Sequence, residues 1–311
     1  MIKKAIFILI ILGVFVYFPV QSTTGFQIEI QDWEKKQELL NIDKKQVEGW
    51  GWKALNINEK RVVNRKIRVA IIDSGIDREH SDLKGIIKKE YNAINSAKSV
   101  VDDTGHGTSV AGIIGAIDNG KGIRGVSDSN SLEIYSIKAF SNNTSKVEYL
   151  ERALKWAIQN NVDIINFSAG TAKESPKLLD LINEATSKNI IIVAAAGNNI
   201  SNEVDFPARL DNVISVGAVN YNLKKLSGTS YGKVDFVGPG TNIITTQPNN
   251  SYGYFGFTSA ATAYVSGVIA NKISSYTDKD NYTLNSILDE LKNNSIDLKN
   301  KDKYGYGFIQ D

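Results

Sequence analysis

The 311-residue sequence has no cysteine and only two histidines. The absence of cysteine excludes a disulfide framework, a thiol nucleophile and a cysteine-ligated zinc site. The formal net charge of +2 gives no reason to expect a nucleic acid or a membrane surface as a partner. Apolar residues make up 42% of the chain and no low-complexity run interrupts it, so the sequence can build a large folded core.

Three short segments, far apart in the chain, carry the groups of a serine hydrolase. They are I-I-D-S-G-I-D around Asp73, D-T-G-H-G-T around His106 and F-T-S-A-A around Ser259. A histidine activates a serine hydroxyl by accepting its proton, and a buried aspartate orients that histidine. The sequence therefore predicts that these three residues meet as a catalytic triad.

The residues beside the first two segments support this prediction. An apolar, β-branched run over residues 69–72 ends at Asp73, which is typical of a buried strand that delivers a carboxylate at its carboxyl end. Glycines flank His106, and the residues after it become apolar at helical spacing. We therefore expect the imidazole at the start of a helix, where the glycines allow a close backbone approach.

Predicted strands and helices alternate along the rest of the chain. Residues 148–159 form an amphipathic helix, and Ser175 followed by proline marks the start of a second one. Apolar runs predict strands over residues 132–137, 162–167, 190–195 and 213–219, and a long helix over residues 258–275 begins at the nucleophile. The alternation predicts an α/β fold with a parallel sheet, right-handed crossovers and helices on both faces.

In the order Asp, His, Ser and in their flanking residues, the three segments resemble those of the subtilisin-like serine proteases, or subtilases. The resemblance extends from about Trp50 to the end of the chain. It implies a three-layer α/β sandwich, with a mainly parallel central sheet flanked by helices, and a peptidase domain over residues 48–311. It also implies a polypeptide substrate and a serine endopeptidase activity carried by Asp73, His106 and Ser259.

A fourth segment, I-I-V-A-A-A-G-N, ends at Asn198. It resembles the subtilase strand whose terminal asparagine forms the oxyanion hole. The resemblance implies that the Asn198 amide and the backbone N–H of Ser259 stabilise the tetrahedral intermediate. Loss of one such donor typically costs about 2.7–4 kcal/mol of transition-state stabilisation. On the residues alone, Gly-Asn after a strand is equally consistent with an ordinary turn.

Two stretches of small residues resemble the substrate-binding walls of the family. An extended peptide would add by main-chain hydrogen bonds to the edge of the strand that ends at residues 168–170. Small residues on both walls leave room for a sizeable side chain before the scissile bond. A buried central strand with a small-residue end is a compatible alternative. The predicted substrate-binding residues are Ser168, Ala169, Gly170, Ala195, Ala196 and Gly197.

The nucleophile segment departs from the family pattern. Phe257 stands where the family has glycine, Ala260 replaces methionine and Ala263 replaces proline. A β-carbon at the glycine position forces strain of about 1–3 kcal/mol if the backbone there is left-handed, and we expect Gly256 to take up the turn instead. All groups for proton transfer and oxyanion binding are retained.

The resemblance also implies a structural calcium ion. Oxygen donors with few charges suit Ca²⁺, and the family's loop supplies an amide, several carbonyls and an aspartate. The alternatives are a plain glycine-rich turn and, for Asp77 and Asp82, solvated turn carboxylates. A dinucleotide site is excluded because the G-x-G-x-x-G at residues 120–125 follows a helix and precedes a strand. The implied ligands are Gln46, Asp82, Ile117, Asn119, Lys121 and Ile123.

The amino terminus predicts export. Two lysines precede an apolar run over residues 5–20, which is the length of a signal-peptide core and short for a membrane span. We expect a signal peptide over residues 1–22, a short pro-segment over residues 23–47, and a secreted, extracellular monomer. The alternative is an uncleaved anchor that holds the protein at the outer face of a membrane.

The sequence thus predicts an exported serine endopeptidase of the subtilisin type. The first alternative is a pseudo-protease that binds peptides without cutting them, because of the altered nucleophile segment. The second alternative keeps the chemistry and narrows the task to processing one secreted peptide, such as a lantibiotic leader.

Overall fold

The structure is a computed structural model that describes residues 42, 44–170, 174–199 and 203–311. The predicted signal peptide, and most of the segment over residues 23–47, lie outside these residues. The chain from Asn41 to Asp311 is one compact unit. In the described part of that unit, no helix has the length and apolar character needed to cross a membrane.

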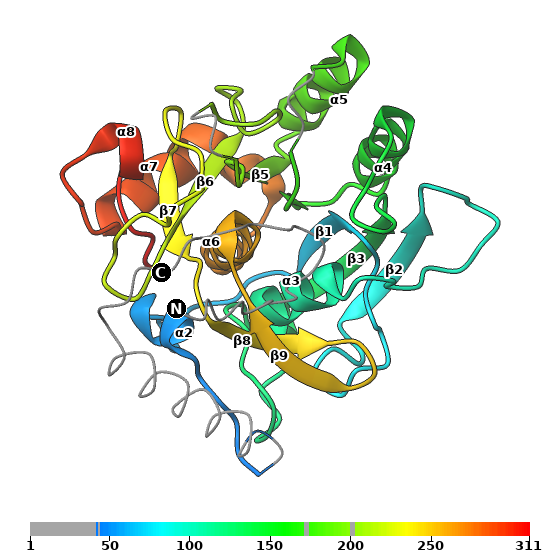
Figure 1. Cartoon of the computed structure of the whole chain (residues 1–311), viewed down its shortest axis with the longest axis horizontal. Coiled ribbons are helices and arrows are strands. Elements are labelled where there is room, and N and C mark those ends of the chain that lie inside the picture. The colour runs from blue at the N-terminus through cyan, green and yellow to red at the C-terminus, as the bar shows by residue number, and fades with distance from the viewer. Residues whose placement is uncertain (1–41, 43, 171–173, 200–202) are drawn as a thin grey trace, which may run out of the picture. The chain divides into compact units, whose positions relative to one another are not determined.

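A sheet of seven parallel strands forms the centre of this unit, in the order β2-β3-β1-β4-β5-β6-β7 (Figure 1). The predicted strands are all present, and two more strands complete the sheet. The bounds are Ile67–Asp73 (β1), Ile87–Asn92 (β2), Leu132–Lys138 (β3), Ile164–Phe167 (β4), Ile191–Ala195 (β5), Ile214–Val219 (β6) and Phe236–Pro239 (β7).

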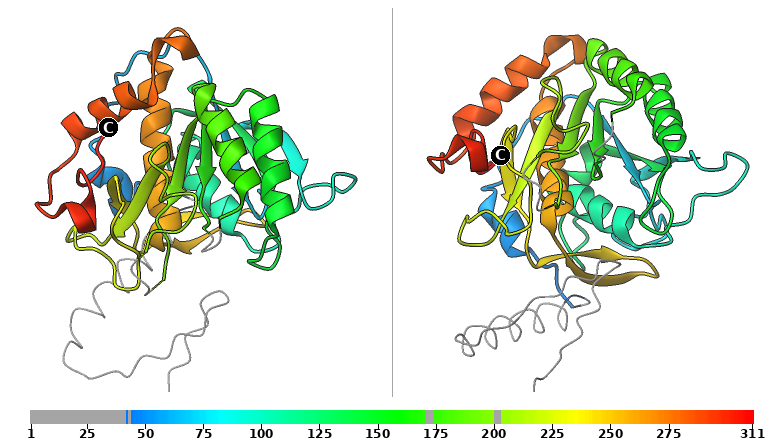
Figure 2. Two further views of the ribbon diagram at one scale, coloured as in Figure 1. Left: turned by 90° about the horizontal axis from the view of Figure 1, so that it is seen from above. Right: turned by 45° about the horizontal axis from the view of Figure 1, so that its top comes forward.

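Helices cover both faces of this sheet, as predicted (Figure 2). Helices α3 and α6 pack on one face, and α4 and α5 pack together on the other. Ser175 caps α5, accepting a hydrogen bond from the backbone N–H of Leu178, and a proline follows at the first helical position. The bounds are Trp50–Ala54 (α2), His106–Gly115 (α3), Val147–Gln159 (α4), Pro176–Ser187 (α5), Phe257–Ser274 (α6), Leu284–Asn294 (α7) and Lys301–Tyr304 (α8).

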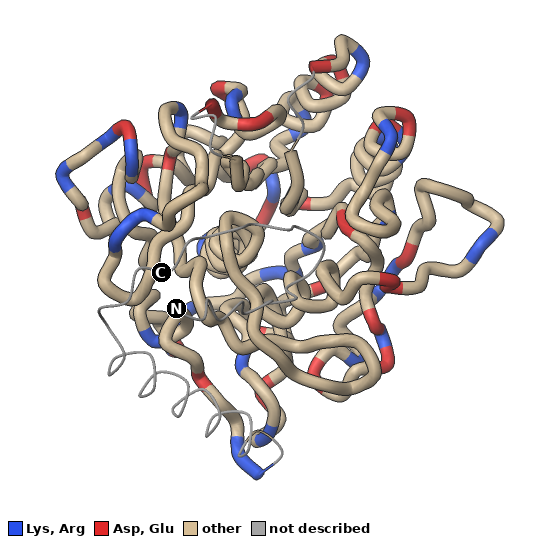
Figure 3. Tube along the Cα trace, in the orientation of Figure 1, with Lys and Arg blue, Asp and Glu red and all other residues tan. Residues whose placement is uncertain are grey.

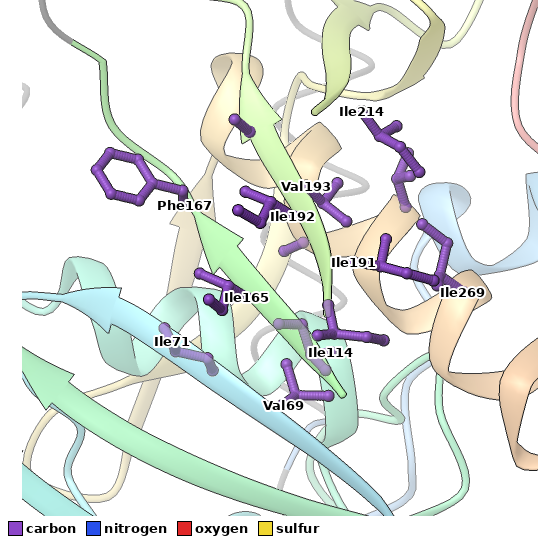
Figure 4. Packing of buried hydrophobic residues seen from close by; sticks show 14 of the residues in the cluster. Val69, Ile71, Ile114, Ile165, Phe167, Ile191, Ile192, Val193, Ile214 and Ile269 are labelled. Atoms are coloured by element: carbon purple, nitrogen blue, oxygen red, sulfur yellow. The ribbon is translucent and has the colours of Figure 1, made fainter. Parts of the chain in front are cut away.

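Buried β-branched side chains hold the layers together. Isoleucines and valines from β1, β4, β5 and β6 meet Ile114 of α3 and Ile269 of α6 in one cluster (Figure 4). Each such side chain contributes about 1.5–3 kcal/mol when it is fully removed from water. Helix α6 is almost completely enclosed, because all its residues except Phe257 and Lys272 are buried. Lys, Arg, Asp and Glu are concentrated in the outer helices and loops (Figure 3).

A hairpin that the sequence analysis did not predict lies beside α3. It consists of β8 (Ile243–Gln247) and β9 (Ser251–Phe255), paired antiparallel. Asn249 and Asn250 in the turn both have left-handed backbone angles. In strand β8, the hydroxyls of Thr245 and Thr246 donate to backbone carbonyls of α3 at 2.7 Å. The hairpin therefore fixes the helix that carries His106.

The strand order reverses between β1 and β4. From β1 the chain continues to β2 and β3 on one side, and to β4, β5, β6 and β7 on the other. Open parallel sheets bind ligands outside the carboxyl ends of the strands at such a switch point. Asp73 ends β1, and Ser168 follows β4 directly, so both lie at this edge.

Candidate active site

Asp73 and His106 form a close pair at the carboxyl edge of the sheet. Nδ1 of His106 lies 2.8 Å from Oδ1 and 2.9 Å from Oδ2 of Asp73. The side chain of Asp73 is only 5% exposed, whereas that of His106 is 31% exposed. This arrangement fixes the proton on Nδ1 and leaves Nε2 as the nitrogen that can accept a proton.

Gly107 allows the strand and the helix to approach each other. A β-carbon on Gly107 would lie 2.1 Å from the carbonyl oxygen of Gly75 and 3.1 Å from Cβ of Asp73. Such a distance to a backbone oxygen cannot be relieved by a side-chain rotation. The glycines beside His106 were predicted to allow a close backbone approach, and Gly107 does so.

A second carboxylate, to which the sequence analysis gave no role, organises the loop before α3. Oδ1 of Asp102 accepts hydrogen bonds from the Ser74 hydroxyl at 2.7 Å and from the backbone N–H of Gly105 at 2.8 Å. Its Oδ2 accepts from the backbone N–H and hydroxyl of Thr108. Asp102 therefore ties the residue after Asp73 to the start of the His106 helix. The sequence signal was an acidic pair just before T-G-H-G.

The protonated form of His106 is stabilised overall. Burial lowers the pKa of His106, but the carboxylate of Asp73, helped by the charge of Asp102, outweighs burial and raises the pKa above its ordinary value of 6.5. An imidazole with a raised pKa is a stronger base in its neutral form. The rings of Phe255 and His106 also contact each other in a T-shaped arrangement, with ring centroids 5.0 Å apart.

Ser259 lies in the first turn of α6. Its hydroxyl is buried and donates to the carbonyl oxygen of Ser168 at 3.1 Å. In the described part of the chain it makes no hydrogen bond to His106. Nucleophile–base hydrogen bonds are often long or absent until a substrate is bound. The structure therefore brings Ser259 to the same edge as Asp73 and His106, with the hydroxyl turned toward β4.

Asn198 follows β5 and lies beside the nucleophile. Its side-chain oxygen accepts hydrogen bonds from the backbone N–H of Thr258 at 3.1 Å and from the Thr258 hydroxyl at 2.7 Å. Because the oxygen is engaged in this way, the amide nitrogen is the end that remains for another acceptor. Thr258 had no role in the sequence analysis, although it directly precedes Ser259.

Phe257, and not Gly256, adopts the left-handed backbone at the nucleophile turn. Its φ is +61°, whereas Gly256 is extended with φ −175°. The expectation that Gly256 takes up the turn is therefore wrong. Left-handed geometry is needed at Phe257 itself, where its backbone N–H donates to the carbonyl of Gly240 at 2.6 Å. The Phe257 side chain is 52% exposed, so the ring is tolerated without disturbing the core.

The predicted substrate-binding residues follow two neighbouring strands. Strand β4 pairs with β1 on one side and β5 on the other, so the strand itself offers no free edge to a peptide. Strand β4 ends at Phe167, so a peptide edge on this segment stays a prediction, and only for residues 168–170. On the facing wall, Ala195 ends β5 and is followed by Ala196 and Gly197.

The residues of the predicted calcium site come together around the loop after α3. The amide nitrogen of Gln46 donates to the carbonyls of Ile117 and Ile123, both at 3.0 Å. Oδ1 of Asp82 accepts from the Asn119 amide at 3.2 Å, and its Oδ2 accepts from the backbone N–H of Ile123 at 2.8 Å. Lys121 lies in the same loop, where its backbone N–H donates to Asn119.

Asp82 is fully buried, so the alternative of a solvated turn carboxylate is wrong for this residue. Asp77 does accept backbone hydrogen bonds in an exposed turn, from Glu79 and Asn249. The donor set around Asp82 fits a hard cation: one carboxylate, two side-chain amides and backbone carbonyls. Rotation of the Gln46 and Asn119 amides would exchange their nitrogens for oxygens. In the described part of the chain, no three acidic or histidine side chains cluster as a metal site.

Comparison with known proteins assigns the family. The sequence profile of the subtilase family matches residues 64–307. The chain belongs to this family. It is 35% identical over 303 residues to the minor extracellular protease Epr of Bacillus subtilis, covering 95% of this chain and 45% of Epr. It is 35% identical to subtilisin amylosacchariticus of Bacillus subtilis subsp. amylosacchariticus, covering 83% of this chain and 68% of that protein. It is 36% identical to the thermostable alkaline protease of Halalkalibacterium halodurans, covering 83% and 71%.

This subtilase chain spans less than half the length of Epr and about two thirds of the other two relatives. The predicted family and fold class are confirmed by the profile match and by the parallel sheet with helices on both faces. The predicted enzyme class is confirmed at the same level, because serine endopeptidase is the class that the family and these relatives indicate.

Proposed function

We propose that this subtilase hydrolyses peptide bonds with Ser259 as nucleophile, His106 as general base and then general acid, and Asp73 as the residue that orients His106. The observation that carries the proposal is the double contact of His106 Nδ1 with both Asp73 oxygens, at 2.8 and 2.9 Å. This contact leaves Nε2 unprotonated and turned away from the aspartate, which is the state a general base needs.

The proposed reaction begins with a rotation of the Ser259 hydroxyl from Ser168 toward His106 Nε2. The serine oxygen attacks the substrate carbonyl carbon while Nε2 takes the hydroxyl proton, and the imidazolium is stabilised by the buried Asp73. The tetrahedral intermediate collapses when the imidazolium gives its proton to the leaving amine. A water molecule then repeats the sequence and releases the acyl group from Ser259.

The negative charge of the intermediate falls on the former carbonyl oxygen. We assign its stabilisation to the Asn198 amide nitrogen and the backbone N–H of Ser259, the latter at the amino terminus of α6, where the helix dipole favours negative charge. The hydrogen bonds from Thr258 to the Asn198 oxygen support this assignment, because they orient the amide with its nitrogen free. A peptide would lie along residues 168–170, with its side chain facing Ala195, Ala196 and Gly197.

The proposed setting is outside the cell, with a calcium ion bound by the loop after α3. The basic start and apolar run at the amino terminus support export, and one relative carries the word extracellular in its name. The buried Asp82, with Gln46, Asn119 and the carbonyls of Ile117, Lys121 and Ile123, would hold the ion. The ion would stabilise this loop electrostatically and would take no part in proton transfer.

A fluorophosphonate probe tests the enzyme directly. Such probes label only a serine that is activated by a general base and an oxyanion hole. We expect labelling of Ser259 in the folded protein and its loss in the Ser259→Ala and His106→Ala variants. Folded protein that resists labelling and cleaves no peptide library member would replace the enzyme with the peptide-binding pseudo-protease.

A further inference from the structure

A carboxylate lies between the two predicted substrate-binding walls. A β-carbon on Gly170 would be 2.9 Å from Oδ2 of Asp205, and one on Gly197 would be 2.3 Å from the same oxygen. The backbone N–H of Asp205 also donates to the carbonyl of Ala196 at 2.9 Å. Asp205 is therefore held against both walls, and its side chain occupies the room that the missing β-carbons of Gly170 and Gly197 leave beside it.

This carboxylate has few partners for its charge. Oδ1 accepts a hydrogen bond from the Asn199 amide at 3.0 Å, and within the described residues Oδ2 has no donor. Burial raises the pKa of Asp205 above its ordinary value, and the Asn199 hydrogen bond and the charge of Arg209 only partly oppose that effect. Arg209 itself is paired with Glu174 at 3.2 Å. A half-buried carboxylate in this condition gains from a cation that enters from outside.

We propose that Asp205 makes the enzyme selective for lysine or arginine at the residue before the scissile bond, an inference that rests on the proposed function of the site. Apart from Ser168, whose hydroxyl already accepts a hydrogen bond from the Asn166 amide at 2.7 Å, the wall residues are glycine and alanine, whose side chains offer a long substrate side chain no polar group. The carboxylate is then the group between them that distinguishes one substrate from another. An arginine or lysine would extend its apolar stem along the small residues and place its charge at Asp205.

A purely structural role for Asp205 makes a different prediction. If its carboxylate only fixes the turn through Asn199, then replacement by asparagine lowers stability and affects all substrates equally. If it receives a substrate cation, then replacement changes the ranking of substrates. The ranking is therefore the decisive readout, and it is independent of how much folded enzyme a preparation contains.

The experiment compares peptides that are identical except at the residue before the scissile bond, with arginine, lysine, citrulline or phenylalanine there. Citrulline has the shape of arginine without its charge. We expect kcat/KM for arginine to exceed that for citrulline by about 10- to 100-fold, and Asp205→Asn to remove this ratio while changing kcat/KM for phenylalanine little. Asp211→Asn removes an exposed carboxylate from a nearby loop and is expected to leave the ratio unchanged.

Each outcome separates this inference from the proposed function. Equal rates for arginine and citrulline, with Ser259 labelled by fluorophosphonate, overturn the selectivity and retain the enzyme. If Ser259 is not labelled and no peptide is cut, the proposed function fails. Binding of uncleaved arginine and citrulline peptides then tests Asp205 by itself: equal affinity overturns the inference, and tighter arginine binding that Asp205→Asn abolishes supports it.

Discussion

The side-chain oxygen of Asn198 accepts two hydrogen bonds from Thr258, the residue that precedes the nucleophile. The predicted oxyanion hole can therefore be tested by a substitution that keeps these two hydrogen bonds. In Asn198→Asp the oxygen that meets Thr258 is retained, while the amide donor is replaced by an acceptor. We expect kcat to fall at least about 100-fold with little change in KM. Steady-state kinetics with a peptide amide substrate provide the measurement.

Thr258→Val is the matched variant, because it removes the hydroxyl and keeps both the backbone N–H and the Asn198 amide. A loss of about tenfold or less is expected, since one of two orienting hydrogen bonds remains. If Asn198→Asp keeps kcat within tenfold of the parent enzyme, the amide is not an oxyanion donor.

The pH dependence follows from the raised pKa of His106. Only the neutral imidazole accepts the proton of Ser259, so kcat/KM should fall as the pH drops through a value above 6.5. The free energy of unfolding depends on pH in the opposite direction to kcat/KM. Because the pKa of His106 is raised in the folded state, protonated His106 stabilises the fold below pH 6.5. This contribution is lost as the pH rises through the folded-state pKa. A pH–rate profile and a histidine NMR titration report the same ionisation.

Replacing Asp73 by asparagine removes the charge that raises this pKa. We expect the NMR titration of His106 to move to lower pH, and kcat to fall by about 10⁴ because the tautomer is no longer fixed. An unchanged titration of His106 would show that Asp73 does not control its charge.

Phe257 predicts an unusual stabilising substitution. A non-glycine residue with φ +61° costs about 1–2 kcal/mol, and its exposed ring returns little of this energy. Glycine removes that strain but adds flexibility to the unfolded chain worth about 0.5–1 kcal/mol. Phe257→Gly should therefore raise the melting temperature by about 1–3 °C and retain activity. The melting temperatures are measured by differential scanning calorimetry in an inactive Ser259→Ala background, which avoids self-digestion. If Phe257→Gly melts at a lower temperature than its parent, the backbone of Phe257 is not strained.

The calcium proposal predicts a chelator effect that depends on Asp82. An ion present at about 100 times its dissociation constant stabilises the fold by about 2.7 kcal/mol, so chelation should lower the melting temperature by about 5–10 °C. Asp82→Asn should melt at a lower temperature and lose most of the chelator response. Asp77→Asn, in the exposed turn nearby, should keep the full response. If the parent protein melts at the same temperature with and without chelator, the proposed calcium ion is not bound.

The sequence predicted the central frame because its physical causes are local. The run ending at Asp73 and the helix that begins at His106 have the periodicity and flanking glycines that define their ends, and both elements form as expected. The hairpin β8–β9 was not predicted, although Asn249-Asn250 is a turn signal of the kind that favours left-handed angles at both positions. Its strands are short, and one of them has little apolar alternation.

The parts of the site that sequence could not supply depend on distant contacts. Asp205 meets Gly170 and Gly197 only after the chain has crossed strands β4, β5 and the loop that follows, and no spacing rule links these positions. Asp102 was visible as an acidic residue near His106, but its role depends on hydrogen bonds to Ser74 and Thr108. At position 257 the sequence identified the departure from the family pattern, but it assigned the turn to Gly256 and not to Phe257, which has the left-handed backbone.

Helix α6 joins the nucleophile to the centre of the fold, because nearly every residue after Ser259 in that helix is enclosed on all sides. Its first turn therefore cannot loosen independently of the layers packed around it. Loss of the reactive serine and loss of the core should be one cooperative event. For this protease, the denaturant concentration at which Ser259 loses its reactivity should then coincide with the midpoint of global unfolding. That concentration therefore also reports on the global free energy of unfolding.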